Sequence, residues 1–275
     1  MDKRSSDVRI ALIGYGKMGA ALLTRWQEVA ASDFPEHRFV VIDPAIETGG
    51  GDGDANVTFL NEPPPLAESG FDLVIVAVKP QVLDEVLPLY ADRLAERGFV
   101  ASIAAGCSIA RLRSLANGAP VVRIMPNLPA AIGAGVSGLC ADPTVTQGQR
   151  DAIEALVAAV GLALWVGDED QLDRLTAIAG SGPGYVFEIA RSYVEAARAL
   201  GFAPEVARQL VLATMAGTIA MAQQSDLALD ELRNSVTSKG GTTAAGLAAL
   251  NGDGGLDRLL TETLEAAYAR AVELR

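Results

Sequence analysis

Short runs of aliphatic and β-branched residues alternate with amphipathic stretches over the first 166 residues. The run at 72–78 (DLVIVAV) is apolar on both faces, which is typical of a strand inside a parallel sheet that helices cover on both sides. An amphipathic helix is expected at 17–31. Strands are predicted at 8–13, 38–42, 72–78, 99–103, 120–124, 136–140 and 162–166. This alternation predicts a doubly wound α/β sheet.

The pattern changes after residue 166, where a short polar break precedes purely helical periodicity. Pro204 falls near the first turn of one of these helices, where a missing N–H costs little. Helices are predicted near 171–200, 204–223, 229–236, 243–251 and 256–274. The chain is therefore expected to form two domains, an α/β domain at 1–166 and an all-helical domain at 167–275.

The helical stretch 211–221 (VLATMAGTIAM) is apolar on nearly every side. A helix of this kind must be buried. It could be the central helix of a monomer, but in a helical domain of this size burial against a second subunit is favoured.

Composition narrows the classes of partner. Half of the 275 residues are hydrophobic, which argues against disorder. The net charge of -12 argues against binding to nucleic acid, whose phosphates are also negative. Cys107 and Cys140 have no metal-type spacing and are expected to be reduced core thiols of a cytoplasmic protein. Residues 1–7 do not resemble a signal peptide, and no apolar stretch is long enough to predict a membrane partner. The glycine-rich segment 49–54 is interpreted as a surface loop, because it lacks the distal Glu of a calcium loop.

A GxGxxG motif follows the first predicted strand directly and precedes a helix. This context favours dinucleotide binding over a tight turn without a ligand. Gly14 would permit the turn, Gly16 would let the backbone approach a pyrophosphate, and Gly19 would let the helix pack on the strand. The pyrophosphate would lie at the helix N-terminus, where free N–H groups favour anions. The motif comprises Gly14, Tyr15, Gly16, Lys17, Met18 and Gly19.

Asp43 ends the second predicted strand, where an acidic residue accepts hydrogen bonds from a ribose 2′-OH and repels a 2′-phosphate. It favours NADH over NADPH, although Asp43 could instead only start a turn before Pro44. Both cofactors therefore stay open. Further cofactor-binding candidates follow other strands, and small residues among them would let a nicotinamide ring lie close. They are Asn61, Ala77, Val78, Lys79, Pro80, Ile103, Ala104 and Ala105.

Two segments of the helical domain, 179–185 and 236–243, contain many glycines and hydroxyl residues, which is unusual in helices. Gly240 and Gly241 would expose backbone N–H groups just before a helix, a geometry that holds a carboxylate. Thr242 or Thr243 could cap that helix, and capping alone is the simpler interpretation. The length and polarity of 236–243 exceed what a cap needs.

The segments GYGKMG, AVKPQ, SIAAG, MPNLPA, GSGPGY and VTSKGGTTAAGL occur in the order and spacing of pyrroline-5-carboxylate reductases. The resemblance covers nearly the whole chain, and SKGGTT is its most diagnostic part. It implies an N-terminal Rossmann domain, a C-terminal helical dimerisation domain, and reduction of 1-pyrroline-5-carboxylate to L-proline. Lys239 stands where the family commonly has Pro, and Leu128 where it commonly has Thr.

The resemblance also implies a substrate site. The residue matching Thr243 lies close to the imine nitrogen in the family, so Thr243 is the expected catalytic residue. The segment 125–127 is expected to form another wall of the site. The family forms homodimers or rings of dimers. The expected substrate-binding residues are Ser238, Gly240, Gly241, Thr242, Thr243, Ser181 and Gly182.

Two other functions remain open. A reductase of another imine or of a β-hydroxyacid would use a catalytic Lys on a helix, but Lys239 lies in the glycine-rich segment. A non-catalytic NAD(P) sensor would keep the Gly16 region without needing residues 238–243. His37, the only histidine, is expected at the surface, far in sequence from this segment, which argues against histidine chemistry.

Overall fold

The computed structural model describes residues 8–33, 36–46 and 55–275, so the segments 1–7 and 49–54 discussed above lie outside it. The chain divides into two compact units, one of Met1–Ser181 with Ala267–Arg275 and one of Gly182–Ala266. This division differs from the sequence-based boundary at 166, because residues 167–181 and 267–275 pack with the α/β unit. The first unit is therefore discontinuous in sequence.

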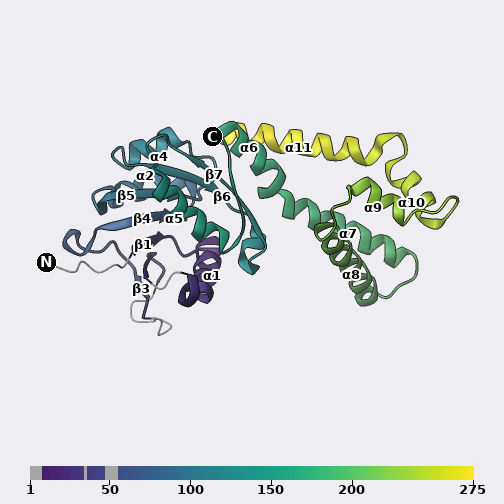
Figure 1. Cartoon of the computed structure of the whole chain (residues 1–275), viewed down its shortest axis with the longest axis horizontal. Coiled ribbons are helices and arrows are strands. Elements are labelled where there is room, and N and C mark those ends of the chain that lie inside the picture. The colour runs from purple at the N-terminus through teal and green to yellow at the C-terminus, as the bar shows by residue number, and fades with distance from the viewer. Residues whose placement is uncertain (1–7, 34–35, 47–54) are drawn as a thin grey trace. The chain divides into compact units, whose positions relative to one another are not determined.

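An eight-stranded sheet forms the centre of the first unit (Figure 1). The strand order is β3-β2-β1-β4-β5-β6-β7-β8, and neighbours are parallel except for β6 and β7. The short edge strand β3 was not predicted. The run 72–78, expected inside a parallel sheet, forms β4, which is parallel to both β1 and β5. The strands are β1 (Val8–Ile13), β2 (His37–Ile42), β3 (Val57–Leu60), β4 (Phe71–Val76), β5 (Leu94–Ser102), β6 (Val121–Met125), β7 (Gly135–Ala141) and β8 (Gly161–Trp165).

Side-chain alternation along the strands makes one core on each face of the sheet. Leu12 packs in a core with Trp26, whereas its neighbour Ile13 packs in another with Leu83. The indole N–H of Trp26 donates to the carbonyl of Leu156 at 2.8 Å and joins two helices on one face. The helices of this unit are α1 (Lys17–Asp33), α2 (Leu83–Val86), α3 (Pro88–Ala91), α4 (Ile109–Leu115), α5 (Gln147–Ala158) and α6 (Glu169–Leu175). The doubly wound α/β class is thus confirmed.

The helical unit contains no strand among its residues, as predicted. Helices α7 and α8 lie side by side within it (Figure 1). Pro204 begins α8, in the position where its missing N–H is harmless. The helix α11 starts in this unit and ends in the first. The elements are α7 (Gly182–Ala199), α8 (Pro204–Gln223), α9 (Leu229–Ser235), α10 (Thr242–Asn251) and α11 (Gly255–Leu274).

The helical unit buries very few apolar side chains. Its buried hydrophobic residues are Ala190, Ala207 and Val211. Along α8, by contrast, Ile219 is 60% exposed and Met221 is 68% exposed. So little buried area cannot stabilise a unit of this size by itself. The apolar helix found in the sequence thus presents its surface outward, as subunit association requires.

Two further expectations concern single residues. Cys107 and Cys140 are buried free thiols, as predicted, and burial raises the pKa of each. His37 was expected at the surface, but it begins β2 and is half-buried against the ring of Phe39. Burial lowers the pKa of His37. Among the described residues, the helices are all too short or too polar to cross a membrane.

Candidate functional site

The three glycines of the GxGxxG turn have different surroundings. Gly14 has a φ of +95°, and a Cβ there would lie 2.8 Å from the carbonyl oxygen of Ala77. A Cβ at Gly19 would lie 2.3 Å from the carbonyl oxygen of Gly14, so this glycine lets α1 pack on the turn. A Cβ at Gly16 would meet no protein atom within 4 Å. Gly14 and Gly19 therefore serve the fold, whereas Gly16 faces open space.

That space belongs to a groove of about 520 Å³ at the carboxyl ends of β1, β4, β5 and β6. The strand order reverses between β1 and β4, which is where ligands bind in open α/β sheets. Met125 and Pro126, which the sequence suggested for a substrate wall, also line the groove. The other lining residues were all predicted to bind cofactor: Gly16, Lys17, Met18, Ala77, Val78, Lys79, Pro80, Ile103, Ala104 and Ala105.

A second pocket of about 120 Å³ shares Val78 with the groove. It is lined by Gly14, Asp43 and Asn61, three of the predicted cofactor residues. The buried phenol of Tyr90 also lines it, and burial raises the pKa of Tyr90 to about 12. No Lys or Arg is among its lining residues in the described part of the chain. The remaining lining residues, not predicted for this site, are Ile13, Ile42, Pro44, Pro63, Val86 and Leu89.

The carboxylate of Asp43 is held by two backbone donors. The N–H of Tyr15 donates to Oδ2 at 2.7 Å, and the N–H of Ala45 donates to Oδ1 at 2.9 Å. Asp43 therefore does start a turn across Pro44, and it also fixes the glycine-rich turn. Each carboxylate oxygen can accept a further hydrogen bond. A ligand hydroxyl is thus compatible with the turn.

Asn127 joins the groove wall at Met125 to the segment that follows α6. Its side chain is buried, donates to the carbonyl of Ala179 at 3.0 Å and accepts from the N–H of Val136 at 2.8 Å. Thr176–Gly180 form a π-turn, which the N–H of Ser181 closes by donating to the carbonyl of Thr176 at 2.9 Å. The glycine-rich segment is thus a π-turn that leads into α7 rather than a break between helices. π-turns inside helices are frequent at functional sites.

The second glycine-rich segment begins α10 in the helical unit. Gly241 is the N-cap residue, with no side-chain cap, so Thr242 and Thr243 are the first two helical residues and neither is the cap. The N–H of Gly241 donates to the carbonyl of Ser238 at 3.0 Å, so it is not free for a ligand as the sequence suggested. A Cβ at Gly241 would lie 2.3 Å from Oγ of Ser238. The N–H of Gly240 and those of the first helical turn remain as donors for a ligand.

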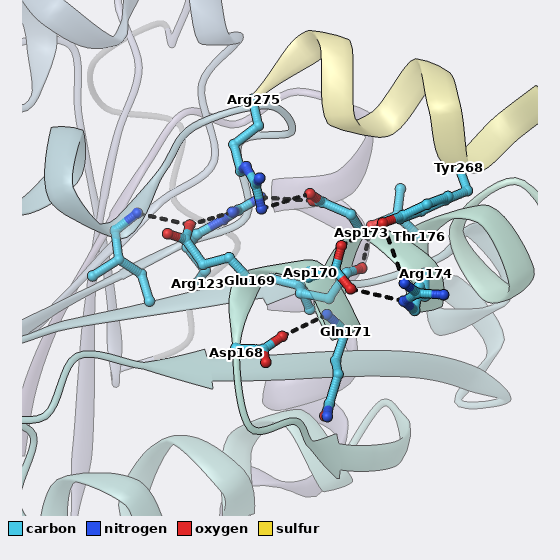
Figure 2. Close-up of polar contacts among 12 residues, drawn as sticks. Arg123, Asp168, Glu169, Asp170, Gln171, Asp173, Arg174, Thr176, Tyr268 and Arg275 are labelled. Carbon is cyan, nitrogen blue, oxygen red and sulfur yellow. Dashed lines mark hydrogen bonds and ion pairs between the residues drawn. The ribbon is translucent and has the colours of Figure 1, made fainter.

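The predicted residues fall in both units. All the cofactor-binding candidates and Ser181 lie in the first unit, whereas Gly182 and the segment 238–243 lie in the helical unit. One buried polar cluster was missed. Arg123 of β6 pairs with Glu169 and faces Asp173, and Figure 2 shows Arg275 approaching Asp173. A single Arg inside the apolar run VVRIM was the one sequence feature that pointed to it.

Comparison with known proteins agrees with this arrangement. The family described as Pyrroline-5-carboxylate reductase dimerisation matches residues 169–274, and the family described as NADP oxidoreductase coenzyme F420-dependent matches residues 9–106. The first match covers the helical unit and both of its connections to the α/β unit. It supports assembly of this chain with further copies of itself.

Relatives match along the whole chain. The pyrroline-5-carboxylate reductase of Pseudomonas aeruginosa is 37% identical over 270 residues, covering 98% of this chain and 97% of the relative. That of Haemophilus influenzae is 34% identical over 268 residues, covering 96% and 97%. Among solved structures, a pyrroline-5-carboxylate reductase from Coxiella burnetii has a TM-score of 0.85 and 32% identity, covering 96% and 97%. A Plasmodium falciparum pyrroline carboxylate reductase with NADP bound shares the fold, with a TM-score of 0.81 and 24% identity, covering 97% and 98%.

The identity to these relatives is high and extends over nearly their full length. The fold, the glycine-floored groove and the segment before α10 all lie within the matched regions. The chain therefore belongs to the pyrroline-5-carboxylate reductase family of NAD(P)H-dependent oxidoreductases.

Proposed function

We propose that this protein reduces 1-pyrroline-5-carboxylate to L-proline with NAD(P)H, the last step of proline synthesis. The observation that carries the proposal is the groove lined by Gly16. It lies where the strand order reverses between β1 and β4, in a chain of this family. Bound NAD(P)H supplies the hydride for the imine carbon. The chain's own residues bind and orient the two reactants.

The groove residues fit a dinucleotide. Free N–H groups in the first turn of α1 offer donors to a pyrophosphate, and Gly16 leaves room for it. The 103–105 stretch and Pro126 form a small, mostly apolar wall against which a nicotinamide ring fits. On this proposal, the cofactor-binding set is the one derived from the sequence, extended by Met125 and Pro126.

The acidic second pocket favours NADH. Asp43 accepts from two N–H groups and keeps acceptor sites for a ribose hydroxyl. Among the residues that the structure describes, those lining this pocket include no Lys or Arg that could pair with a 2′-phosphate. NADH is accordingly the proposed preferred cofactor, with NADPH as the alternative.

The substrate would be bound by the segment 238–243. The first-turn N–H groups of Thr242 and Thr243 offer donors for its carboxylate. Lys239 is exposed and adds a positive charge to the same segment. The hydroxyl of Thr243 is proposed to assist protonation of the imine nitrogen. Ser238, Gly240 and Gly241 shape this turn, and Ser181 and Gly182 are proposed to contribute a second wall.

The active assembly is proposed to be a homodimer or a ring of dimers. Its support is the small number of buried side chains in the helical unit and the exposed apolar surface of α8. In functional terms we divide the chain into a cofactor-binding domain at 1–166 and a substrate and dimerisation domain at 167–275. The free, buried cysteines favour a cytoplasmic location.

The test is parallel oxidation of NADH and NADPH by the purified protein with 1-pyrroline-5-carboxylate, with chromatographic detection of proline. Turnover to proline is expected with both cofactors and more efficiently with NADH. Turnover favouring NADPH would keep the reaction and reject the assignment of Asp43 to the ribose. Cofactor binding without turnover would reject the reaction and direct attention to other cyclic imines or to a sensing role.

A further inference from the structure

The last turn of α11 lies against the loop that follows β5. Gly106 of this loop has a φ of +69°, and a Cβ built there would lie 2.4 Å from the carbonyl oxygen of Leu274. Backbone therefore contacts backbone, with no space between the loop and the helix end. The same loop lines the groove with Ile103, Ala104 and Ala105. One short loop thus meets the proposed cofactor site and, one residue later, the end of α11.

Charged side chains extend this contact. Figure 2 shows Arg275 reaching from the end of α11 toward Asp173 of α6. Its guanidinium lies 3.1 Å from Oδ2 of Asp173, a contact between charges that lacks hydrogen-bond geometry. Oδ1 of the same carboxylate lies 3.8 Å from Arg123 of β6. Asp173 and Arg123 are both buried, so water does little to screen that pair, whereas the side chain of Arg275 is partly exposed.

The cluster also reaches the far end of the loop. Arg123 forms an ion pair with Glu169. Oε1 of Glu169 accepts a hydrogen bond from the backbone N–H of Ile109 at 2.9 Å, where α4 begins. The series from Arg275 through Asp173, Arg123 and Glu169 therefore ends at the residue where the loop enters α4.

The carboxylates of Asp173 and Glu169 each have a cation as partner in this cluster. Burial raises the pKa of Asp173, and the nearby Arg123 and Arg275 oppose that rise. A buried carboxylate needs such partners, and removal of one leaves an uncompensated charge. Of the cations paired with Asp173 in the described part of the chain, Arg275 is the closer.

We propose that Arg275 is a positioning residue for cofactor binding, which holds the last turn of α11 against Gly106 and so fixes the loop 103–106 in the groove wall. The inference rests on the proposed cofactor role of the groove. Arg275 touches neither pocket, so it acts only through this loop. Because α11 is continuous from Gly255 to Leu274, the groove wall is supported by a helix that begins in the helical unit.

The test compares R275A with R270A in the complete protein, by calorimetric titration with NADH and by steady-state kinetics. Arg270 lies on the same helix in an exposed pair with Glu273, which makes R270A the matched control. R275A is expected to raise the Kd and the KM for NADH by roughly two- to thirty-fold, the range of remote coupling effects. At saturating cofactor, kcat should stay within about twofold of wild type. R270A should leave the Kd unchanged, and R275K should restore most of the affinity because it keeps the charge.

A second variant, R275Q, removes the charge but keeps the aliphatic stem and a polar end, and is used if R275A fails to fold. A folded R275A or R275Q that binds NADH with the wild-type Kd would overturn the proposal, even with a lower Tm, because a purely stabilising role predicts that result. Failure of the wild-type protein to bind NADH or NADPH would instead reject the proposed cofactor role of the groove. The two failures are therefore distinguishable.

Discussion

The backbone N–H of Tyr15 donates a hydrogen bond of 2.7 Å to the carboxylate of Asp43. This bond connects the middle of the glycine-rich turn with the end of β2, two segments that together face the second pocket. Asp43 thus combines a structural role with its proposed contact to the ribose. A useful substitution must remove the charge and keep the hydrogen bond.

Asp43→Asn removes the charge and keeps the bond from Tyr15 through its amide oxygen, although its amide NH2 cannot accept from Ala45. It is expected to raise the ratio of kcat/KM for NADPH over NADH about tenfold or more, since like charges about 4 Å apart repel by about 1–4 kcal/mol. Asp72→Asn is the matched control, because Asp72 also accepts a backbone N–H, that of Arg9 at 2.9 Å, and lines neither of the two cofactor pockets. An unchanged ratio in D43N would contradict the ribose assignment.

Gly16 and Gly19 should respond differently to alanine. The methyl group of G16A meets no protein atom within 4 Å and enters the groove, so cofactor binding should weaken by about 1–3 kcal/mol with the fold retained. The methyl group of G19A would lie 2.3 Å from the carbonyl of Gly14, so the free energy of unfolding should fall by about 1–3 kcal/mol. Urea unfolding and cofactor titration of both variants separate the effects. Similar defects in the two variants would refute the distinction.

Thr243→Ala removes the hydroxyl proposed to assist at the imine nitrogen. A hydrogen bond to a charged group contributes about 1.5–3 kcal/mol, so kcat/KM should fall about ten- to a hundredfold, and T243S should recover most of the loss. Thr261→Ala is the control, because the Thr261 hydroxyl donates to the carbonyl of Asp257 within α11. Wild-type kcat/KM in T243A would exclude this role for the hydroxyl.

Ile219 is 60% exposed in the single chain and is expected to be buried in the assembly. Ile219→Asp places a charge in an apolar interface, so the dissociation constant of the oligomer should rise at least about tenfold. Sedimentation velocity over a range of concentrations measures this. Gln223→Asp introduces the same charge at the end of α8 and should leave the assembly intact. If the assemblies of I219D and wild type have equal masses at every concentration, the interface lies elsewhere.

His37 should titrate below its ordinary pKa, because burial outweighs the charge of Glu36. A lowered pKa in the folded state means that the neutral form is favoured by folding. Its contribution to stability is therefore complete above about pH 6.5 and is lost as the pH falls through the folded pKa. The protein has one histidine, so a single imidazole signal followed by NMR gives the value directly. Urea unfolding of H37Q should show a weaker dependence on pH in this window, and a pKa at or above the ordinary value would contradict the prediction.

The sequence was informative where a local pattern determines the structure. The apolar run at β4 and the glycine turn before α1 predicted a buried strand and a groove, because alternation and backbone freedom are local properties. The edge strand β3 was missed because it is short, with three partly buried residues and one exposed residue, and lacks a clear pattern. The direction of β7 was not predicted, because side-chain alternation is the same in parallel and antiparallel strands.

Contacts between distant residues could not be derived from pattern. The cluster of Arg123, Asp173 and Arg275 joins residues that are far apart in sequence, and periodicity carries no information on such pairs.

Local turns without a clear pattern were also beyond prediction. The hydrogen bond from Gly241 to Ser238 closes a turn that composition does not specify. The substrate residues themselves came from the resemblance rather than from physical reasoning, so their roles remain predictions.

The discontinuity of the first unit has a consequence for biosynthesis. Residues 267–275 belong to the α/β unit, yet they are translated after the whole of Gly182–Ala266. The loop at Gly106 therefore emerges from the ribosome long before Leu274, the residue that packs against it. During synthesis the α/β unit can form its sheet, but its contacts at the groove wall stay incomplete until α11 is made. Full competence to bind cofactor should thus await the synthesis of α11, well after the nucleotide-binding sequence is complete.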